Sequence, residues 1–504
     1  MPRAASRLLL ALSIVLIAGC ALAPRQPPPV AREAREPCYE MFRRVDLAIA
    51  EAGVADGMAA RVAGFPYLRV DRFLASYARE ELAGARFAEW MNRMIALGAS
   101  GHAVELGNLS EEKAEALAHQ LWDLDRRYAR PRGAIAECAA RLAAADFNEP
   151  GRRAALKQAA QVPDDYLTWQ RVAGLYWLTR LPFAQGIRSW HDEVRAEFAT
   201  PLERPTVQGR LETYAPPPGR LTGREIATLF ERASANPLGI PEPRGAELDA
   251  LYRTFAPVFV VDAASSADRP GELGWFGAEV PQVGGAGPVV YRRISHARYR
   301  GRVLLQLNYA IWFPERPLGA GWDILGGHLD GVLWRVTLAP DGVPWVYDSI
   351  HLCGCYHQFF PTASAALRPQ EAGLDETAFV PLMLPAVGPG DRIVLRLAAG
   401  THYLRGVTPE AAVVPRAIEY RFADDDALRS VPLPEGGRRS VFRPDGIVPG
   451  SERGERYLFW PMGVPEPGAM RQWGRHATAF VGRRHFDDAG LMERYFVMKG
   501  VNSE

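Results

Sequence analysis

One short segment of the chain, His351-Leu-Cys353-Gly-Cys355-Tyr-His357, concentrates residue types that bind soft metal ions. The two histidines and two cysteines alternate with other residues, so on a β-strand all four would project from one face. An extended run of this length covers about 20 Å, whereas the ligand atoms of one tetrahedral ion lie within about 4 Å of each other. One ion could therefore bind only two of them, unless Gly354 bends the chain sharply.

Further ligands for such an ion would have to come from neighbouring strands. The best placed are His328 and Asp330 in the sequence Gly-Gly-His-Leu-Asp, and His402 is a weaker choice. A divalent transition metal held here could activate a bound water, with His351 or His357 completing the ligand shell or moving protons. The predicted metal ligands are His328, Asp330, His351, His357, Cys353 and Cys355.

Two other interpretations of the same segment stay open. Cys353 and Cys355 could form a disulfide with each other, while the histidines act as ordinary polar groups of a loop. Alternatively, the cysteines are small packed side chains and the histidines are hydrogen-bonded core residues. The spacing matches neither a zinc-ribbon nor a haem-attachment motif.

Missing motifs and the charge balance exclude several classes of protein. The chain has no Gly-x-Ser-x-Gly, no His-Glu-x-x-His and no phosphate-binding loop, which argues against ATP-driven work and common hydrolases. Its 59 basic and 58 acidic residues nearly cancel, so no overall field attracts nucleic acid. Whether the protein is an enzyme stays open.

The first nineteen residues have the pattern of a bacterial export signal. Arg3 and Arg7 precede an apolar stretch from Leu8 to Ala18, which is too short to cross a bilayer as a helix. The stretch ends at Ile17-Ala18-Gly19-Cys20, which resembles the lipobox of bacterial lipoproteins. The resemblance implies that residues 1–19 are removed and that Cys20 becomes the lipid-modified N-terminus.

The residue after Cys20 bears on which membrane holds the protein. Ala21 is not the aspartate that usually retains lipoproteins at the inner membrane. We therefore expect a lipid anchor in the outer membrane, facing the periplasm. Because that compartment is oxidising, Cys38 and Cys138 are natural disulfide partners, closing a loop of about a hundred residues.

The chain is expected to have an α+β fold in two parts. A Pro-rich tether over 20–36 leads to a helical domain over 37–235, a linker over 236–245 and a mainly β domain over 246–504 that ends in a helix. In the β domain, apolar residues alternate from Val303 to Phe313, with Gln306 and Asn308 on the opposite face.

Part of the β domain resembles the secreted necrosis-inducing-protein family. The likeness rests on Ala256-Pro-Val-Phe-Val260, Val290-Tyr-Arg-Arg293, Tyr309-Ala-Ile-Trp-Phe-Pro314 and the following Gly-His turn, within residues 255–360. That family is a β-sandwich that binds a divalent cation and docks on lipid head groups. The resemblance implies a sandwich-like, mainly antiparallel C-terminal domain with His328 and Asp330 as ligands. The turn here lacks the family's glutamate and one histidine.

Two functions follow from these patterns. In the first, an envelope lipoprotein uses a metal site in its β domain for ligand binding or for hydrolysis of an envelope component. In the second, a non-catalytic structural or assembly lipoprotein docks a protein partner. The expected partners are the membrane, through the lipid, and an envelope protein or a lipid or glycan ligand. The identity of a substrate stays open.

Overall fold

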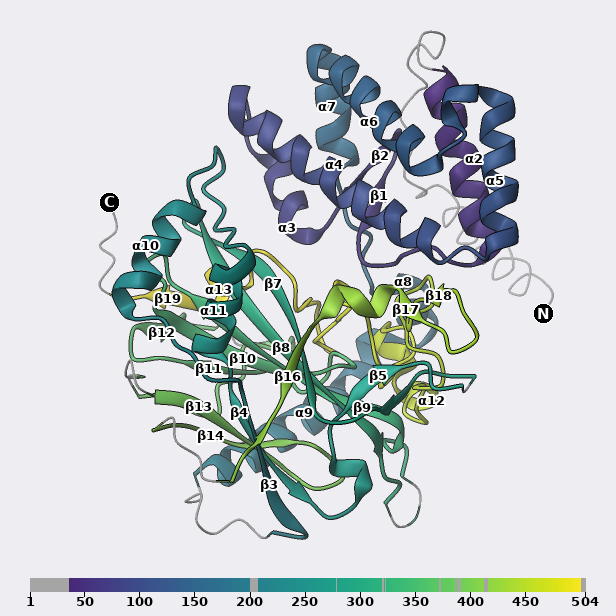
Figure 1. The fold of residues 1–504 in the computed structure, drawn as a ribbon. Coiled ribbons are helices and arrows are strands. Elements are labelled where there is room, and N and C mark those ends of the chain that lie inside the picture. The colour runs from purple at the N-terminus through teal and green to yellow at the C-terminus, as the bar shows by residue number, and fades with distance from the viewer. Residues whose placement is uncertain are drawn as a thin grey trace, which may run out of the picture.

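The structure is a computed structural model, in which the signal segment, Cys20 and the predicted tether up to Arg35 lie outside the described residues. The described residues are 36–199, 207–277, 279–319, 321, 323–370, 373–385, 387, 391–411 and 416–499. Helices come first and sheets follow, which confirms the expected α+β class (Figure 1). No helix among the described residues has the length and apolarity that a membrane span requires.

The N-terminal helical unit surrounds a small β-hairpin (Figure 1). Its elements are α2 (Glu36–Ala52), β1 (Ala60–Val62), β2 (Phe65–Val70), α3 (Arg72–Ala75), α4 (Gly84–Gly107), α5 (Glu111–Leu124), α6 (Pro131–Asn148) and α7 (Pro150–Ala159). Their helical sequence period accounts for the packing. In α5, for example, Ser110 caps the first turn, and Leu117 and Leu121, four residues apart, are both buried.

Cys38 in α2 and Cys138 in α6 are disulfide-bonded, as the sequence predicts. Their Cα atoms lie 5.2 Å apart, and 100 residues separate them along the chain. The bond therefore ties the first helix of the unit to one formed much later in the sequence.

Two sheets form the C-terminal part. The six-stranded sheet has the order β11-β10-β9-β8-β7-β16, and the five-stranded sheet has the order β14-β13-β4-β3-β15. The strands of the first are β7 (Val289–Tyr299), β8 (Arg302–Arg316), β9 (Gly327–Leu338), β10 (Pro344–His351), β11 (Gln358–Pro361) and β16 (Arg421–Asp424). Those of the second are β3 (Arg210–Ala215), β4 (Val258–Ala263), β13 (Asp391–Leu397), β14 (Leu404–Ala411) and β15 (Ile418–Glu419).

Most strands of these sheets pair antiparallel, with three parallel pairs: β16 with β7, β13 with β4, and β15 with β3. Besides the β1–β2 hairpin of the helical unit, the remaining strands form three small two-stranded sheets. They pair β5 (Glu272–Gly274) with β6 (Gln282–Gly284), β12 (Ala365–Leu367) with β19 (Phe496–Met498), and β17 (Val431–Pro432) with β18 (Arg438–Arg439).

The two large sheets share one apolar core, so they form a sandwich. Tyr309 and Trp334 from the larger sheet and Phe259 and Leu395 from the smaller one belong to the same buried cluster. Two helices, α10 (Gly223–Ala233) and α11 (Gly245–Phe255), pack into this core as well. Helix α10 begins with the capping box between Thr222 and Glu225.

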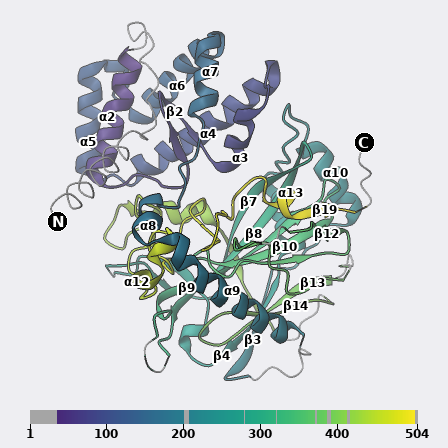
Figure 2. The ribbon, with the colours of Figure 1, turned by 180° about the vertical axis from the view of Figure 1, so that it is seen from behind.

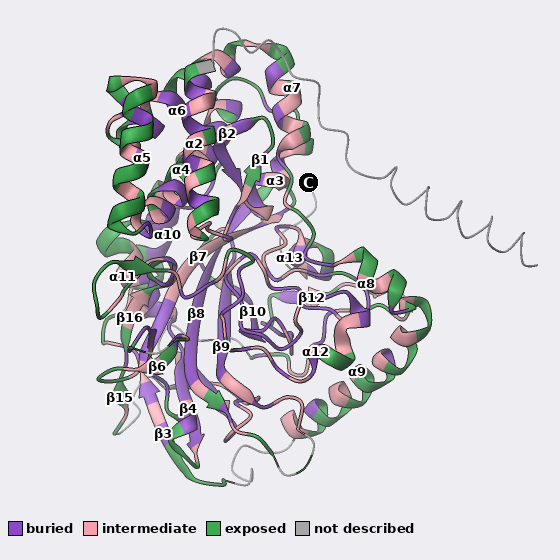
Figure 3. Ribbon diagram, turned by 90° about the vertical axis from the view of Figure 1, so that its right-hand side faces the viewer, coloured by how far each residue is buried: buried purple, intermediate pink, exposed green. Residues whose placement is uncertain are grey.

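The second face of the larger sheet is also buried. The alternation of apolar and polar residues along its strands does not predict this. Every residue of β8 from Val303 to Phe313 is buried, including Gln306 and Asn308 (Figure 3). Gln306 bonds the Thr337 hydroxyl at 3.1 Å, and the Asn308 amide donates to the Arg293 carbonyl at 3.0 Å. The C-terminal tail and the helical unit cover this face. The amide nitrogens of Gln306 and Asn308 are paired within the protein, whereas Asn308 Oδ1 is buried with no hydrogen-bond partner among the described residues.

The packing divides the chain earlier than the predicted linker at 236–245. Most of the apolar core of the helical unit comes from Cys38 to Ala160, and Leu238 and Ile240 of the predicted linker pack into it too. The next helices, α8 (Thr168–Ala173) and α9 (Tyr176–Phe198), pack against the C-terminal part. Strand β3 and helix α10, both placed in the helical domain by sequence, belong to the sandwich. A helical period shows that a helix forms, but not which core it covers.

The last segment of the chain differs from the single helix expected there. Helix α13 (Leu491–Tyr495) has only five residues, and the chain continues into β19, which pairs with β12. Buried ion pairs then join the tail and the sandwich to the helical unit. Arg72 binds Asp165 at 2.7 Å and Asp487 at 3.1 Å, and Arg429 binds Asp56 at 2.6 Å.

Candidate functional site

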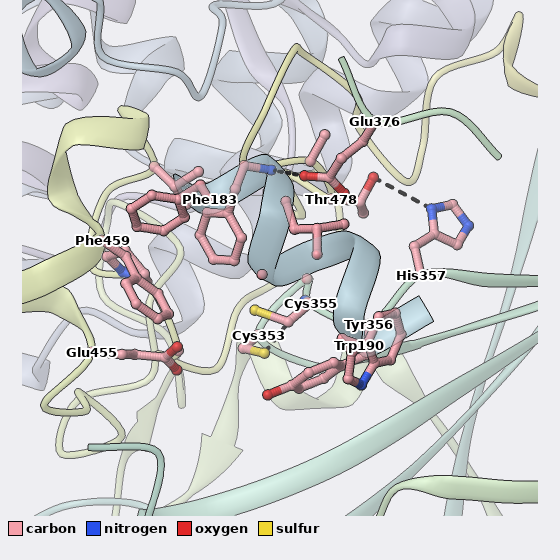
Figure 4. A pocket seen from close by; sticks show the side chains of 18 of the residues that line it. Phe183, Trp190, Cys353, Cys355, Tyr356, His357, Glu376, Glu455, Phe459 and Thr478 are labelled. Atoms are coloured by element: carbon pink, nitrogen blue, oxygen red, sulfur yellow. Dashed lines mark hydrogen bonds between the residues drawn. The ribbon is translucent and has the colours of Figure 1, made fainter. Parts of the chain in front are cut away.

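A cavity of about 550 Å³ lies between α9, the loop that follows β10, helix α12 (Arg456–Phe459) and the C-terminal tail (Figure 4). Helix α9 runs across the C-terminal part in Figure 2 and forms one wall. Its lining side chains recur at helical spacing. They are Pro182, Phe183, Ile187, Trp190 and His191, with Gly186 between them.

Aromatic rings make most of the wall rigid. Phe183 packs edge-on against Phe459, with ring centres 5.1 Å apart, and Phe459 contacts Phe480 at 5.4 Å. On the other side, Trp190 lies 5.3 Å from Tyr356. The cavity therefore offers a mostly apolar surface whose shape is set by packed rings.

The floor of the cavity is the segment in which the sequence places soft metal ligands. Strand β10 ends at His351, and the chain then turns back so that the His351 amide donates to the Cys355 carbonyl at 3.0 Å. Gly354 makes this turn with a φ of +94°, and a Cβ there would lie 2.5 Å from the Ala477 carbonyl oxygen. The extended run of four alternating side chains is thus not formed, because Gly354 does bend the chain.

The turn brings the two free thiols together on the floor (Figure 4). The Cys355 amide donates to the Cys353 sulfur at 3.4 Å. A hydrogen bond from the Cys355 thiol, helped by nearby Arg453, lowers the pKa of Cys353 despite its burial. The same hydrogen bond, together with burial, raises the pKa of Cys355 well above its usual value. Cys353 is therefore the thiol that ionises first.

Glu455 supplies a titratable carboxyl at the same cavity (Figure 4). Burial raises the pKa of Glu455 to about 7, against the opposing effects of Arg453, Arg316 and Arg471. Among the described residues, none donates a hydrogen bond to this carboxylate. A carboxyl that exchanges its proton near neutral pH in a cavity can act as a general acid or base, or bind a polar ligand group.

His357 lines the cavity and belongs to a buried hydrogen-bonded network. Its Nε2 lies 2.8 Å from Asp348, which also accepts two hydrogen bonds from Arg335 at 2.9 and 2.5 Å. Burial lowers the pKa of His357 to about 3, although Asp348 opposes the shift. The ring is therefore neutral at physiological pH, with Nδ1 3.4 Å from the Thr478 hydroxyl.

Behind the floor, Asp330 is the centre of a second buried network. His402 Nδ1 lies 2.8 Å from Asp330, His351 Nδ1 3.4 Å and Arg453 3.2 Å. Burial opposes the charge on Asp330, but these three neighbours outweigh it and hold its pKa well below the usual value. Burial also opposes protonation of His402, yet Asp268 and Asp330 raise its pKa.

Backbone strain gathers at these residues. Leu329, Tyr356 and His402 have φ values of +59°, +60° and +50°, a backbone region that residues other than glycine seldom adopt. Such residues persist where the surrounding structure holds them, often at functional sites. All three lie within the floor or directly beside Asp330.

The structure does not bring the six predicted metal ligands into one set. His328 contacts the Pro281 carbonyl at 2.6 Å, His351 lies beside Asp330, and His357 lies beside Asp348. Within the described ranges, no group of three or more His, Cys, Asp or Glu side chains is placed to hold a metal ion. Apart from His328, the residues instead join two buried hydrogen-bonded networks and a pair of thiols.

Several site residues could not be found from sequence. Glu455, Asp348 and Arg453 stand in no recognisable motif, and the apolar face of α9 is indistinguishable from an ordinary core face. The one local signal was the glycine between two cysteines, which marks a turn.

Comparisons of the chain with known proteins found no relative. The chain matches no known family model, no curated protein and no solved structure. The lipobox and the resemblance to necrosis-inducing proteins therefore stay predictions, and any function has to be argued from the site itself.

Proposed function

We propose that the protein is a lipid-anchored envelope protein that binds an amphipathic organic ligand in the cavity described above. The observation that carries this proposal is the cavity of about 550 Å³ with aromatic walls and a small polar floor. Ligand sites in proteins are typically of this size and are mostly apolar, with a few convergent polar groups.

The two ends of the cavity suggest how such a ligand would bind. Its apolar body would contact Phe183, Ile187 and Phe459, which line the wall. Its polar end would meet the Glu455 carboxyl and the Cys353 thiol. The predicted acylation of Cys20 supports an address at the outer membrane, facing the periplasm, where lipids and glycans are available as ligands.

Filling the cavity tests the proposal. Gly186 lines the cavity within α9, and a Cβ there would meet no atom within 4 Å. We expect Gly186→Phe to weaken binding of a dansyl-labelled undecanoic acid by about tenfold or more, because the new ring occupies ligand space. The measurement is a fluorescence titration of the full-length protein in nanodiscs, with mass spectrometry of any copurified ligand.

Gly151 provides the matched control, since it is an exposed glycine in α7 with open space around its Cα. Gly151→Phe should bind the probe like the unchanged protein. If the unchanged protein binds no probe and carries no ligand, or if Gly186→Phe binds equally well, ligand binding in this cavity is excluded. The structural or assembly role would then be favoured.

A second candidate function is thiol–disulfide exchange, favoured by the adjacent Cys353 and Cys355. The Cys353 thiolate would attack one sulfur of a substrate disulfide, forming a mixed disulfide and releasing one substrate thiol. Cys355 would then attack the Cys353 sulfur, forming a Cys353–Cys355 disulfide and releasing the second thiol. The substrate is reduced, the protein is oxidised, and the two cysteine protons end on the two product thiols. Glu455 is placed to carry one of them.

Oxidised glutathione tests this second function. Cys355→Ser stops the reaction after its first step, so the variant should accumulate one glutathione on Cys353, seen by intact mass. The unchanged protein should instead lose two hydrogens by forming its internal disulfide. If neither species gains or loses mass under conditions that oxidise a free dithiol, exchange at this site is ruled out.

A further inference from the structure

The corner between α8 and α9, together with helix α12, exposes a set of large apolar side chains. We call this set the α8–α9 corner, and its outward direction is visible in Figure 3, where α8 and α9 carry exposed residues. Trp169, Val172 and Trp177 are 63%, 71% and 68% exposed. The α8–α9 corner comprises Trp169, Val172, Leu175, Trp177, Leu178, Leu181, Tyr457 and Leu458.

Hydrogen bonds and close packing attach the inner side of the corner to the C-terminal part. The backbone is thereby held in place with its apolar side chains facing solvent. Arg171 donates to the Met462 carbonyl at 2.8 Å and the Gly482 carbonyl at 2.7 Å. The Leu167 amide donates to the Gly463 carbonyl at 2.7 Å. A Cβ on Gly174 would lie 2.5 Å from that of Pro461, which shows how closely the two segments pack.

Arginine is the only acid or base of fixed charge within the segment that carries most of the corner, and acidic residues border it. Residues 166–191 contain Arg171, Arg180 and Arg188 but neither aspartate nor glutamate, and Arg456 begins α12. Asp165 precedes the segment, Asp192 follows it, and Asp375 lies 3.9 Å from Arg180. Exposed tryptophan, tyrosine and leucine accompanied by arginine are typical of helices that lie in the interface of a bilayer with anionic lipids. A core-facing or freely solvated helix would not combine these residues on an outward face.

The chain before α2 indicates which surface covers the corner. Fifteen residues, Ala21 to Arg35, separate the predicted lipid anchor at Cys20 from the first described residue. Fully extended, they span about 50 Å. An anchored protein would therefore hold its body within reach of the bilayer at high effective concentration.

We propose that the α8–α9 corner rests in the interface of an anionic phospholipid bilayer. Leu181 precedes Pro182, and Leu458 precedes Phe459, so the corner continues directly into the wall of the cavity. The bilayer would thus lie beside the cavity, and a ligand with an acyl chain could pass between them. The docking itself goes beyond the proposed ligand binding and does not depend on an occupied cavity.

Lipid photocrosslinking tests the docking. The full-length protein is reconstituted in vesicles of three parts phosphatidylethanolamine to one part phosphatidylglycerol, with a trace of a phospholipid that carries a diazirine on its acyl chain. We expect adducts in peptides 168–181 and 456–459. The triple variant Trp169→Gln, Trp177→Gln, Leu178→Gln should lower their yield by about tenfold or more, because three apolar anchors are lost.

The control replaces Leu47 and Trp122 by Gln, two side chains of the helical unit that are 47% and 46% exposed. It should leave the yield unchanged. Equal labelling of the triple variant and the unchanged protein would overturn the proposal. Adducts confined to other peptides would overturn it too. In intact cells, a photoreactive amino acid placed at Trp177 should crosslink to lipid, and a crosslink to a protein instead would also overturn it. Binding of the dansyl probe should persist in the triple variant, whereas Gly186→Phe should lose the probe and keep the adducts. Each proposal can therefore fail without the other.

Discussion

At the scale of single residues, the site is governed by burial of groups that carry charge or exchange protons. Asp330 and Asp348 stay ionised because cationic or hydrogen-bonding neighbours outweigh desolvation. At Glu455 the nearby arginines do not outweigh burial, which dominates its titration and raises its pKa. Burial also raises the pKa of Glu376, a second carboxyl that lines the cavity. A carboxyl whose pKa is raised by burial inside a ligand-sized cavity is a candidate functional group.

The pKa of Glu455 predicts how stability depends on pH. The folded state holds this proton up to about pH 7, whereas an unfolded chain releases it near the ordinary value of 4.5. The folded state therefore binds more protons between these values, and stability falls as pH rises through that window. The loss from this one group is about 3 kcal/mol.

Glu455→Gln removes the titration, so we expect its free energy of unfolding to change less between pH 4.5 and pH 7 than that of the unchanged protein. Urea denaturation at several pH values measures this difference. Glu435→Gln, at an exposed position, serves as the control and should follow the unchanged protein. Parallel pH profiles for Glu455→Gln and the unchanged protein would contradict a buried carboxyl that titrates near neutrality.

At the scale of elements, the helical unit depends on a cross-link between helices that are distant in sequence. The disulfide between α2 and α6 restricts the unfolded chain over a separation of 100 residues. In the chain-entropy model, a loop of that length contributes about 4–5 kcal/mol. Helices α2 and α6 also contact each other in the native packing, so the bond adds to an existing interface.

We expect the double variant Cys38→Ala, Cys138→Ala to lower the stability of the helical unit by about 2–5 kcal/mol. Hydrogen exchange should show α2 and α6 losing protection before the strands of the sandwich. Reduction of the unchanged protein with dithiothreitol should have the same effect, and the reduced mass should rise by two hydrogens for this bond. Unchanged protection of α2 would mean that helix packing alone holds the unit together.

At the scale of the whole molecule, the two parts are joined by buried ion pairs as well as by apolar contact. Arg429, on the segment after β16, binds Asp56, on the segment between α2 and β1, and both side chains are almost fully buried. Removing one partner of such a pair leaves an uncompensated charge, which typically costs about 3–5 kcal/mol. An exposed pair of the same chemistry is worth far less.

Arg429→Met should therefore destabilise the protein by about 3 kcal/mol and weaken the coupling between its parts. Calorimetry of the unchanged protein should show one transition, and that of the variant should show the helical unit and the sandwich unfolding separately. Arg232→Met, in the exposed pair with Glu247, should change stability by no more than about 0.5 kcal/mol. Equal effects of the two variants would contradict a structural role for the buried pair.

Local sequence was sufficient for the features that depend on neighbouring residues. It determined the α+β order of the chain, the strand β8, and the start of α10 at Thr222, because periodicity and capping act within a few residues. The pairing of Cys38 with Cys138 followed from the small number of cysteines together with the predicted oxidising compartment. The sequence named Gly354 as the position where the chain could bend, and it left open whether the bend forms.

Only the tertiary structure decided which groups meet. Gln306 and Asn308 alternate with apolar residues like the exposed side of a strand, yet a tail more than a hundred residues away covers them. Helix α9 has an ordinary helical period but leaves the helical unit to form a wall of the cavity. Glu455 acquires its raised pKa mainly through burial. Burial is a property of what packs against a residue from distant parts of the chain, and a local pattern carries no record of it.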